Sequence, residues 1–511
     1  MFINCPFTIP KGFPFGQPNV TLPLHFKQWT SHTDCIMQRL CFCVYCTNKS
    51  LCNFSINILD LQNFPSALYF VKTLKKNFGD MIDKKNFEKV IILLNVPTVI
   101  EAKFLDDEEI DAAIFMGHPG LTGTKAVAEI IAGKVNPSGH LVDTWPYSVK
   151  SAPSYQNFGN DTTLSHTGGS TGKFTNYQEG IYVGYRYYVT RGMVDSDYKY
   201  DEEVQYSFGH GLSYTKFDKR IIASEIDKEN KKVGITVEVE NIGEVAGKDV
   251  IQIYTHAPYN PGGIEKSWYS LTAFEKTNVI EPGDKKAYKL EFSFRDIASW
   301  STEKGYYITE KGKYEFSLRE NVWDIATSKN SGVTNVVEMT LDNDVEFKKS
   351  YQTGFDYENI FQDVEWGAGT EKIEYLSRND FKGTWKNKED IDRTADSSKF
   401  PGGNSNTTAG ASFTFEDNQI DEELREQGKD NGLKFADFKD ADWDDDRWED
   451  LLDQLTITDL ENLVDQGSFK TASIDSIEKA GTTDYDGPGA AFHSGTGHPS
   501  EVIVAASWNT D

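Results

Sequence analysis

Residues 111–133 read DAAIFMGHPGLTGTKAVAEIIAG, and they decide the fold class of the first half of the chain. Their apolar start follows a similar run, KVIILLNV, at 89–96, and such runs are typical of strands buried on both faces of a parallel sheet. Residues 124–133 predict a short helix that ends at Gly133. Strand, connection, strand and helix together predict an α/β domain, and the loop 117–123 follows the strand end where open α/β sheets bind ligands.

Residues 221–320 predict a second, all-β fold class. In VGITVEVE the residues Val233, Ile235, Val237 and Val239 alternate onto one face, and AYKLEFSF at 287–294 alternates in the same way. Turn sequences such as EPGD at 281–284 separate these segments. Short alternating strands with Gly/Pro turns predict a β-sandwich of about 100 residues.

Two helices are predicted near the end of the chain. The first carries four apolar residues on one face: Trp448, Leu451, Leu452 and Leu455. For the second, Thr458 and Glu461 have the spacing of a capping box, and Gly467 is the stop signal.

The balance of charge limits the classes of partner. The chain has 79 acidic and 52 basic residues, for a net charge of −27. Such a surface repels phosphate backbones and anionic lipid, so no nucleic acid and no membrane surface is expected as a partner, whereas a neutral substrate is not repelled. No apolar stretch approaches the roughly 18 residues of a membrane span, and the first residues do not resemble a signal peptide.

All six cysteines fall in the first 52 residues, at Cys5, Cys35, Cys41, Cys43, Cys46 and Cys52. A disulfide-stapled secreted protein would spread its cysteines through its domains, so this pattern fits a reducing setting. The cluster CFCVYC lacks the paired C-x-x-C and downstream His of known zinc patterns, and no metal is expected. The alternatives are a disordered segment or a mistranslated piece of the gene.

Several motifs resemble family 3 glycoside hydrolases, the β-glucosidases and their relatives. AAIFMGHPGLTGTKAVAEIIAGKVNPSGHLVDTWP, YQEGIYVGYRYY and YSFGHGLSYTKF resemble the C-terminal α/β part of that family, and VENIGEVAGKDVIQIY resembles the fibronectin type III-like domain that follows it. WEDLLDQLTITDLENLV and DYDGPGAAFHSGTGHPSEVIVAASWN resemble the start of the family's catalytic barrel. Several separate blocks of the sequence agree with the same family, so a chance resemblance is less credible than it would be for a single motif.

The resemblance implies a domain order that is reversed relative to most members, and YLSRNDFKGTW at 375–385 is similar to the subgroup with that order. The expected fold class is therefore α/β plus all-β. The expected domains are an atypical Cys-rich segment at 1–70, a partial α/β sandwich at 71–218, a fibronectin type III-like sandwich at 219–322, an insertion or linker at 323–440, and the beginning of a (β/α) barrel at 441–511. We expect the reading frame to continue into a full barrel, because a closed barrel needs about 200 more residues.

The resemblance implies hydrolysis of O-glycosyl bonds by two carboxyl groups about 5–5.5 Å apart, with retention of configuration. The family's nucleophile is an Asp late in the barrel, and its acid/base Glu precedes the KVIILLNV strand, where this sequence has no Glu before Glu88. No catalytic residue can therefore be identified in this chain. The expected substrate is an oligosaccharide or an aryl or alkyl β-glycoside, and no cofactor is implied.

One binding residue is carried over from the family. Asp486, in the Asp-Gly-Pro turn, matches an Asp that hydrogen-bonds sugar hydroxyls, although such an Asp can also simply cap its own turn. The following Ala490, Ala491 and Phe492 depart from the family pattern, so no neighbouring residue is carried over.

Three further residues have structural interpretations. Glu179 is expected to pair with Arg186 in a buried contact rather than act as an acid, and His118 is expected to be a loop residue at the sheet edge. The sequence FGHGLSY with His210 is expected to form a turn that packs between domains.

The sequence leaves two functional interpretations open. One is a β-glucosidase-type hydrolase in carbohydrate catabolism, and the other is a non-catalytic carbohydrate-associated fragment or binding module. A cell-surface adhesion module is disfavoured because it would need neither NPSGHLVDTWP nor a barrel start. Location, cytoplasmic or secreted, and oligomeric state are not indicated.

Overall fold

The computed structural model describes the chain from residue 89 onward in segments, together with short strand pairs. The segments are 89–96, 98–120, 123–157, 177–329, 334–359, 374–384, 427–467, 470–483 and 499–510, besides Gly332. The short pairs are β1 (Arg39–Leu40) with β2 (Leu59–Asp60), and β6 (Leu164–Ser165) with β7 (Thr171–Gly172). The six cysteines and Asp486 lie outside the described residues, so what the sequence predicts for them stays a prediction.

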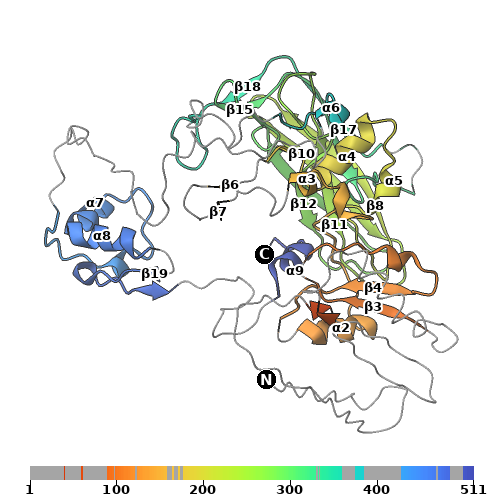
Figure 1. Ribbon diagram of the computed structural model, residues 1–511, viewed down its shortest axis with the longest axis horizontal. Coiled ribbons are helices and arrows are strands. Elements are labelled where there is room, and N and C mark those ends of the chain that lie inside the picture. Colours follow the sequence, from red (N-terminus) through yellow and green to blue (C-terminus); the bar gives the residue numbers. More distant parts are fainter. Residues whose placement is uncertain are drawn as a thin grey trace, which may run out of the picture.

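The α/β domain begins with two parallel strands, β3 (Ile91–Leu94) and β4 (Ala112–Phe115). The 3-10 turn η2 (Lys103–Asp106) lies in their connection, and helix α2 (Gly123–Ile131) follows β4. Gly133 has φ +68°, the left-handed conformation that lets glycine end a helix. The predicted order of strand, strand and helix is present (Figure 1).

Burial of these strands differs from the predicted pattern of two covered faces. In β3 the side chains of Ile92 and Leu94 are buried, and the other two side chains of the strand are half-buried. In β4, by contrast, Ala112 and Ala113 are exposed. The described part of this sheet has only these two strands, and the alternating burial in β3 indicates that one face carries most of the apolar packing. Its core consists of Val90, Ile92, Leu94, Val96, Ala102 and Trp145.

The rest of the α/β domain leads into the sandwich. β5 (Trp145–Pro146) pairs antiparallel with β8 (Val204–Tyr206). Between them lie η3 (Val149–Ser151), α3 (Pro153–Asn157), α4 (Tyr185–Val194) and α5 (Tyr200–Glu203). Tyr187 and Tyr188 of α4 belong to the same buried cluster as Tyr254 of the sandwich. The two domains therefore share apolar packing along α4.

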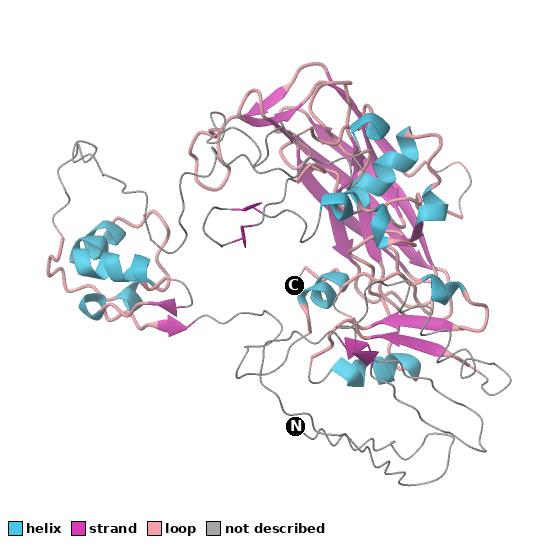
Figure 2. Ribbon diagram, viewed as in Figure 1, coloured by secondary structure: helices cyan, strands magenta, loops and turns pink. Residues whose placement is uncertain are grey.

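The sandwich contains two antiparallel sheets, which Figure 2 shows as long strands packed face to face. The first sheet has the order β13 (Lys285–Ser293), β10 (Lys232–Asn241), β9 (Phe217–Asp227). The second has the order β12 (Ser270–Lys276), β11 (Val250–His256), β16 (Gly312–Arg319), β17 (Val336–Leu341). A smaller sheet joins β14 (Ser299–Ser301), β15 (Tyr306–Thr309) and β18 (Val345–Phe347).

The alternating residues that predict this sandwich form its core. Val233, Ile235, Val237 and Val239 are each 0% exposed, and they share one cluster with Leu290 and Phe292 of the neighbouring strand β13 and with Phe294, which follows it. The sandwich continues past residue 322, the boundary expected from sequence, because β17 pairs with β16 and buries Val337, Met339 and Leu341. The alternation in VVEMTL at 336–341 is the signal that the sequence interpretation missed.

Part of the segment expected to be a linker packs tightly on the folded body. Leu376 is buried, and the segment ends in the short helix α6 (Phe381–Thr384). Glu265 anchors the segment, because it accepts hydrogen bonds from the Tyr182 hydroxyl and from Ser377 Oγ, the latter at 2.6 Å. Residues 374–384 are therefore a fixed part of the structure and not a free connection.

A small helical unit follows at 427–483. It contains η6 (Phe435–Phe438), α7 (Arg447–Gln454), α8 (Ile457–Asp465) and η7 (Asp475–Ile477), and β19 (Lys470–Thr471) pairs with β20 (Thr482–Thr483). Its buried cluster consists of Phe438, Leu451, Leu455, Ile474 and Ile477. Among the helices that the structure describes, none is long and apolar enough to cross a bilayer.

Two details of these helices differ from the prediction. Leu452 is 43% exposed, so it lies beside the packed face of α7 and not on it. The capping box is formed by Thr456 and Asp459, since Asp459 N donates to Thr456 Oγ1 at 3.1 Å and Thr456 N donates to Asp459 Oδ2 at 2.9 Å. Thr458 and Glu461 therefore lie inside a helix that starts earlier than their spacing suggests.

The sandwich core predicts the cost of removing one of its aromatic side chains. Phe316 is 0% exposed and contacts Phe292 edge to face, with 5.1 Å between ring centroids. Phe316→Ala should lower the free energy of unfolding by roughly 3–5 kcal/mol, measured by denaturant titration. The control Phe355→Ala, at a side chain that is 75% exposed, should change it by less than about 0.5 kcal/mol. Equal effects of the two variants would contradict this core assignment.

Candidate functional site

The last described segment docks against the carboxyl end of strand β4. Ser500 N donates to the carbonyl of His118 at 2.8 Å, and the helix α9 (Glu501–Ala506) follows. A Cβ at Gly117, which has φ +49°, would lie 2.2 Å from Ile503 Cγ1. Ile503 can therefore fit only because residue 117 is glycine. This edge is where the sequence predicts ligand binding in an α/β sheet.

Trp508 completes the docking at a point where both domains meet. Its side chain is 4% exposed, and its indole Nε1 donates to the carbonyl of His140 at 3.1 Å. His140 N in turn donates to the carbonyl of Ala506 at 2.9 Å. The indole lies against Phe208 and, edge to face, against Phe274 of β12. This segment is thus held by a buried aromatic residue with a satisfied donor.

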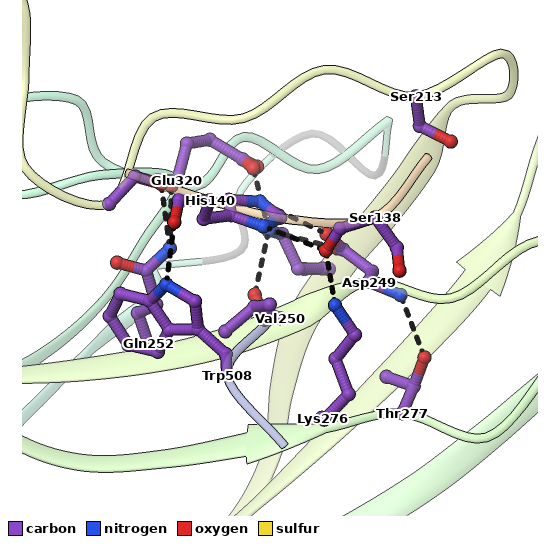
Figure 3. A network of polar contacts seen from close by, with 12 residues as sticks. Ser138, His140, Ser213, Asp249, Val250, Gln252, Lys276, Thr277, Glu320 and Trp508 are labelled. Atoms are coloured by element: carbon purple, nitrogen blue, oxygen red, sulfur yellow. Dashed lines mark hydrogen bonds and ion pairs between the residues drawn. The ribbon is translucent and has the colours of Figure 1, made fainter. Parts of the chain in front are cut away.

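An ionic network lies beside Trp508, as Figure 3 shows. Lys219 is 1% exposed, and its Nζ lies 3.0 Å from Asp249 Oδ2 and 2.6 Å from Glu320 Oε2. Burial alone would lower the pKa of Lys219, but the two carboxylates raise it above its ordinary value. For Asp249 burial favours a raised pKa, yet the charge of Lys219 brings the net shift downward. Lys219 and Asp249 therefore stay ionised inside the protein, whereas burial raises the pKa of Glu320.

His140 is the titratable group that joins this network to the docked segment. Its side chain is 9% exposed, its Nδ1 lies 3.3 Å from the carbonyl oxygen of Ser138, and its Nε2 lies 3.8 Å from Asp249 Oδ1. Burial lowers its pKa from 6.5 to about 4, and this outweighs the opposing effect of Asp249. His140 is consequently neutral at physiological pH.

The same geometry limits what the network can do chemically. A His–Asp pair acts as a general base when a nucleophile lies within hydrogen-bond reach of the free ring nitrogen. Within the described segments, neither ring nitrogen of His140 has a hydroxyl as a hydrogen-bond partner. Asp249 is held by Lys219, and its backbone N–H donates to Thr277 Oγ1 at 2.8 Å. The arrangement fixes domains to one another and is not set up for nucleophilic catalysis.

The structure places the other sequence-selected residues around this junction. His118 is exposed in the loop after β4, as expected for a loop residue, and its carbonyl receives the docked segment. His210 lies in a turn whose carbonyl accepts from Leu141 N at 2.8 Å, and its ring stacks on Tyr206. Burial lowers the pKa of His210. The turn connects to the sandwich through Gln252, whose side chain donates to the carbonyl of Gly209.

The expected ion pair between Glu179 and Arg186 is not formed, so that prediction is wrong. The Arg186 guanidinium lies over the Tyr185 ring at 5.4 Å, while the Glu179 side chain is 7% exposed and its Oε2 has no hydrogen-bond partner. Burial raises the pKa of Glu179. Arg186 lies in the first turn of α4, which begins at Tyr185, whereas Glu179 lies before the helix; the sequence spacing alone did not indicate this boundary.

Metal-ligating side chains do not gather in the described ranges. No group of three or more His, Cys, Asp or Glu side chains among these residues is placed to hold a metal ion. Trp508 and Lys219 are the residues of this junction that sequence reasoning missed. The signal for Lys219 is weak, because a lysine in an alternating strand is normally taken as solvent-facing.

In comparison with known proteins, the α/β domain and the sandwich each match a separate family. Residues 72–185 match the family described as Glycosyl hydrolase family 3 C-terminal domain, and residues 249–322 match the Fibronectin type III-like domain. The chain is 34% identical over 289 residues to a protein named Beta-glucosidase from Ruminococcus albus, covering 54% of this chain and 28% of that protein. It is 31% identical over 299 residues to Beta-glucosidase A from Butyrivibrio fibrisolvens, covering 55% of this chain and 33% of that one.

Among solved structures, a beta-glucosidase from Paenibacillus barengoltzii is similar at 29% identity and a TM-score of 0.45, covering 53% of this chain and 28% of that chain. The chain thus spans about a third or less of the length of the curated relatives named above.

The buried, neutral His140 predicts how stability depends on pH. Its pKa is about 4 in the folded chain and 6.5 as the ordinary value, so the unfolded chain binds a proton first as pH falls. Stability should therefore decrease as pH falls from about 6.5 to about 4, by up to roughly 3 kcal/mol. The measurement is the free energy of unfolding against pH for the wild-type chain and His140→Gln. The variant should show a smaller decrease over this window, and an identical pH profile would contradict the assignment.

Proposed function

We propose that this chain serves β-glucosidase-type hydrolysis of O-glycosyl bonds in carbohydrate catabolism. Its α/β domain matches the C-terminal domain of family 3 glycosyl hydrolases, and a fibronectin type III-like sandwich follows that domain. The substrate is an oligosaccharide or an aryl or alkyl β-glycoside. Support comes from relatives named beta-glucosidases, which are just over 30% identical to this chain over about half its length.

The observation that carries this proposal is the docking of residues 499–510 on the end of β4. The sequence of that segment resembles the start of the family's barrel, and Ser500 N bonds directly to the carbonyl of His118 in the loop after the strand. We infer that a barrel-type segment meets the α/β domain here, at the sheet edge where such folds bind ligands. A sugar site shared by the two parts would lie at this meeting point.

Within that function, this chain's own share is to bind sugar. Asp486 lies on the stretch that leads into the docked segment, and we propose that its carboxylate accepts hydrogen bonds from sugar hydroxyls. Cleavage with retention needs two carboxyl groups about 5–5.5 Å apart. The position that the family's acid/base Glu takes, ahead of β3, lies in a stretch with no Glu before Glu88. We therefore expect binding without cleavage from this chain by itself.

A second candidate function is a carbohydrate-binding protein that is not catalytic. The buried titratable groups at the junction favour it, because His140, Asp249 and Lys219 are engaged with one another. Groups held in this way stabilise the junction and are not free to transfer protons to a substrate.

Incubation of the chain with an aryl β-glucoside tests whether the chain binds sugar without cleaving it. We expect no release of the aryl group above the uncatalysed rate, together with saturable binding of glucose measured by calorimetry. Turnover at rates ordinary for glycosidases would contradict the claim that this chain lacks an acid/base carboxyl group. A folded chain that neither binds glucose nor turns over the glucoside would contradict both candidate functions.

Asp486 can be tested against a matched neighbour. Asp486→Asn keeps the shape of the side chain but removes the charge that strengthens hydrogen bonds from hydroxyls, so glucose binding should weaken at least tenfold. Asp484→Asn, two residues earlier, makes the same change in charge and should leave binding within twofold. If both variants bind like the wild-type chain, Asp486 is not a sugar ligand.

A further inference from the structure

The segment 374–384, which we call the clasp, bonds to both the α/β domain and the sandwich. On the α/β side, Leu376 N donates to the carbonyl of Gln178 at 2.7 Å. On the sandwich side, Arg378 N donates to the Glu265 carboxylate at 3.0 Å. The side chain of Leu376 is buried, so these bonds flank an apolar contact that excludes water. The clasp therefore helps to hold the two domains together.

The seam between the clasp and the α/β domain runs along the loop before α4. Tyr375 of the clasp lies against Gly180, since a Cβ at Gly180 would be 3.8 Å from Tyr375 Cδ1. Gly180 has φ +55°, the left-handed conformation that favours glycine. Glu179 stands between Gln178, which bonds to the clasp, and Gly180, which faces it. A carboxyl group is thus placed at the seam.

This carboxyl group is buried with one oxygen unsatisfied. Glu179 is 7% exposed, and its Oε2 has no hydrogen-bond partner. Burial raises its pKa, and a bond from its own backbone N–H offsets that shift only in part. An unpaired carboxylate is costly to bury, whereas the protonated, neutral carboxyl group costs much less. The closed seam therefore favours the protonated form of Glu179.

The charged groups of the elements that meet at this seam are engaged elsewhere. They are Arg186 over the Tyr185 ring, Arg378 over the Tyr259 and Trp268 rings, Lys382 with Asp197, Lys266 with Glu310, and Glu265 with the Tyr182 hydroxyl. Glu374 and Asp380 of the clasp are exposed, as is Tyr177. Among the described residues, none of these groups contributes to the shift in the pKa of Glu179.

We propose that Glu179 is a protonation switch that sets how tightly the clasp holds the two domains. While the carboxyl group carries its proton, it stays buried at the seam and the clasp is closed. Once the proton leaves, the carboxylate reaches water when the clasp moves away from Gln178 and Gly180. Loss of the proton is thereby coupled to opening of the clasp.

The direction of the switch follows from the raised pKa of Glu179 in the closed state. With the clasp open, the carboxyl group has its ordinary pKa of 4.5 and releases its proton first as pH rises. The clasp is therefore tightest below pH 4.5 and loosens as pH rises through the pKa of the closed state. His140 acts in the opposite direction, because its protonation weakens the junction as pH falls.

Amide hydrogen exchange of the full chain tests this switch, with a peptic peptide that covers the clasp. After correction for the intrinsic exchange rate, protection of the clasp in the wild-type chain should fall at least about threefold between about pH 5 and about pH 9. In Glu179→Gln the side chain is neutral throughout this range, so protection of the clasp should stay constant. The control Glu202→Gln, at an exposed carboxyl group of α5, should keep the wild-type profile.

Constant protection of the clasp in the wild-type chain would overturn the proposal without any variant. A fall of equal size in the sandwich strand 232–241 would also overturn it, because the whole chain and not the clasp would then be loosening. Should Glu179→Gln fail to unfold cooperatively, Glu179→Ala also lacks the titrating group and should show the same constant profile. A pH dependence that persists in either folded variant would assign the effect to another group and contradict the proposal.

Discussion

The backbone of His140 carries the contact on which the arrangement of this chain depends. Its carbonyl accepts the indole N–H of Trp508, and its N–H donates to the carbonyl of Ala506. Its ring faces Asp249 of the sandwich on the other side. One residue thus touches the α/β domain to which it belongs, the sandwich, and the C-terminal segment. Together with the bond from Ser500 N to the His118 carbonyl, this contact fixes residues 499–510 at the end of β4.

The ionic network below His140 explains why the histidine stays neutral there. Lys219 lies between Asp249 and Glu320, so the buried positive charge is already matched by carboxylates. A protonated His140 would add a second buried cation whose desolvation the remaining charge does not offset, and burial accordingly lowers its pKa to about 4. Buried ion pairs are weak evidence for stability by themselves, but they are strongly destabilising to break. Loss of one partner from this network is therefore expected to destabilise the junction.

The sequence was most informative where a period could be read directly. The alternation of Val233, Ile235, Val237 and Val239 predicted a buried sheet face, and all four are fully buried. The parallel pair β3–β4 and the helix that follows were likewise predictable, because strand runs and a glycine stop are local signals. Family resemblance then supplied the identities of the α/β domain and the fibronectin type III-like sandwich, which the matches at 72–185 and 249–322 confirm; the barrel start at 441–511 stays a prediction.

Long-range contacts were predictable only in part. Nothing local at Lys219 indicates that it is buried, since its partners Asp249 and Glu320 are distant in sequence and only the sandwich topology brings them together. The capping box of α8 was misplaced by two residues because Thr456 and Thr458 have nearly the same local pattern. The pair Glu179–Arg186 failed for a related reason, since charge and spacing do not fix the direction of a side chain.

Amide hydrogen exchange at the His140 loop tests the central claim most directly. In the wild-type chain the His140 N–H is bonded to the Ala506 carbonyl, so a peptic peptide covering residues 136–146 should exchange slowly. Trp508→Ala should raise exchange in this peptide and leave the sandwich strand 232–241 unchanged. Equal exchange of the loop in both chains, with the sandwich intact, would contradict the claim that Trp508 holds the C-terminal segment against the α/β domain.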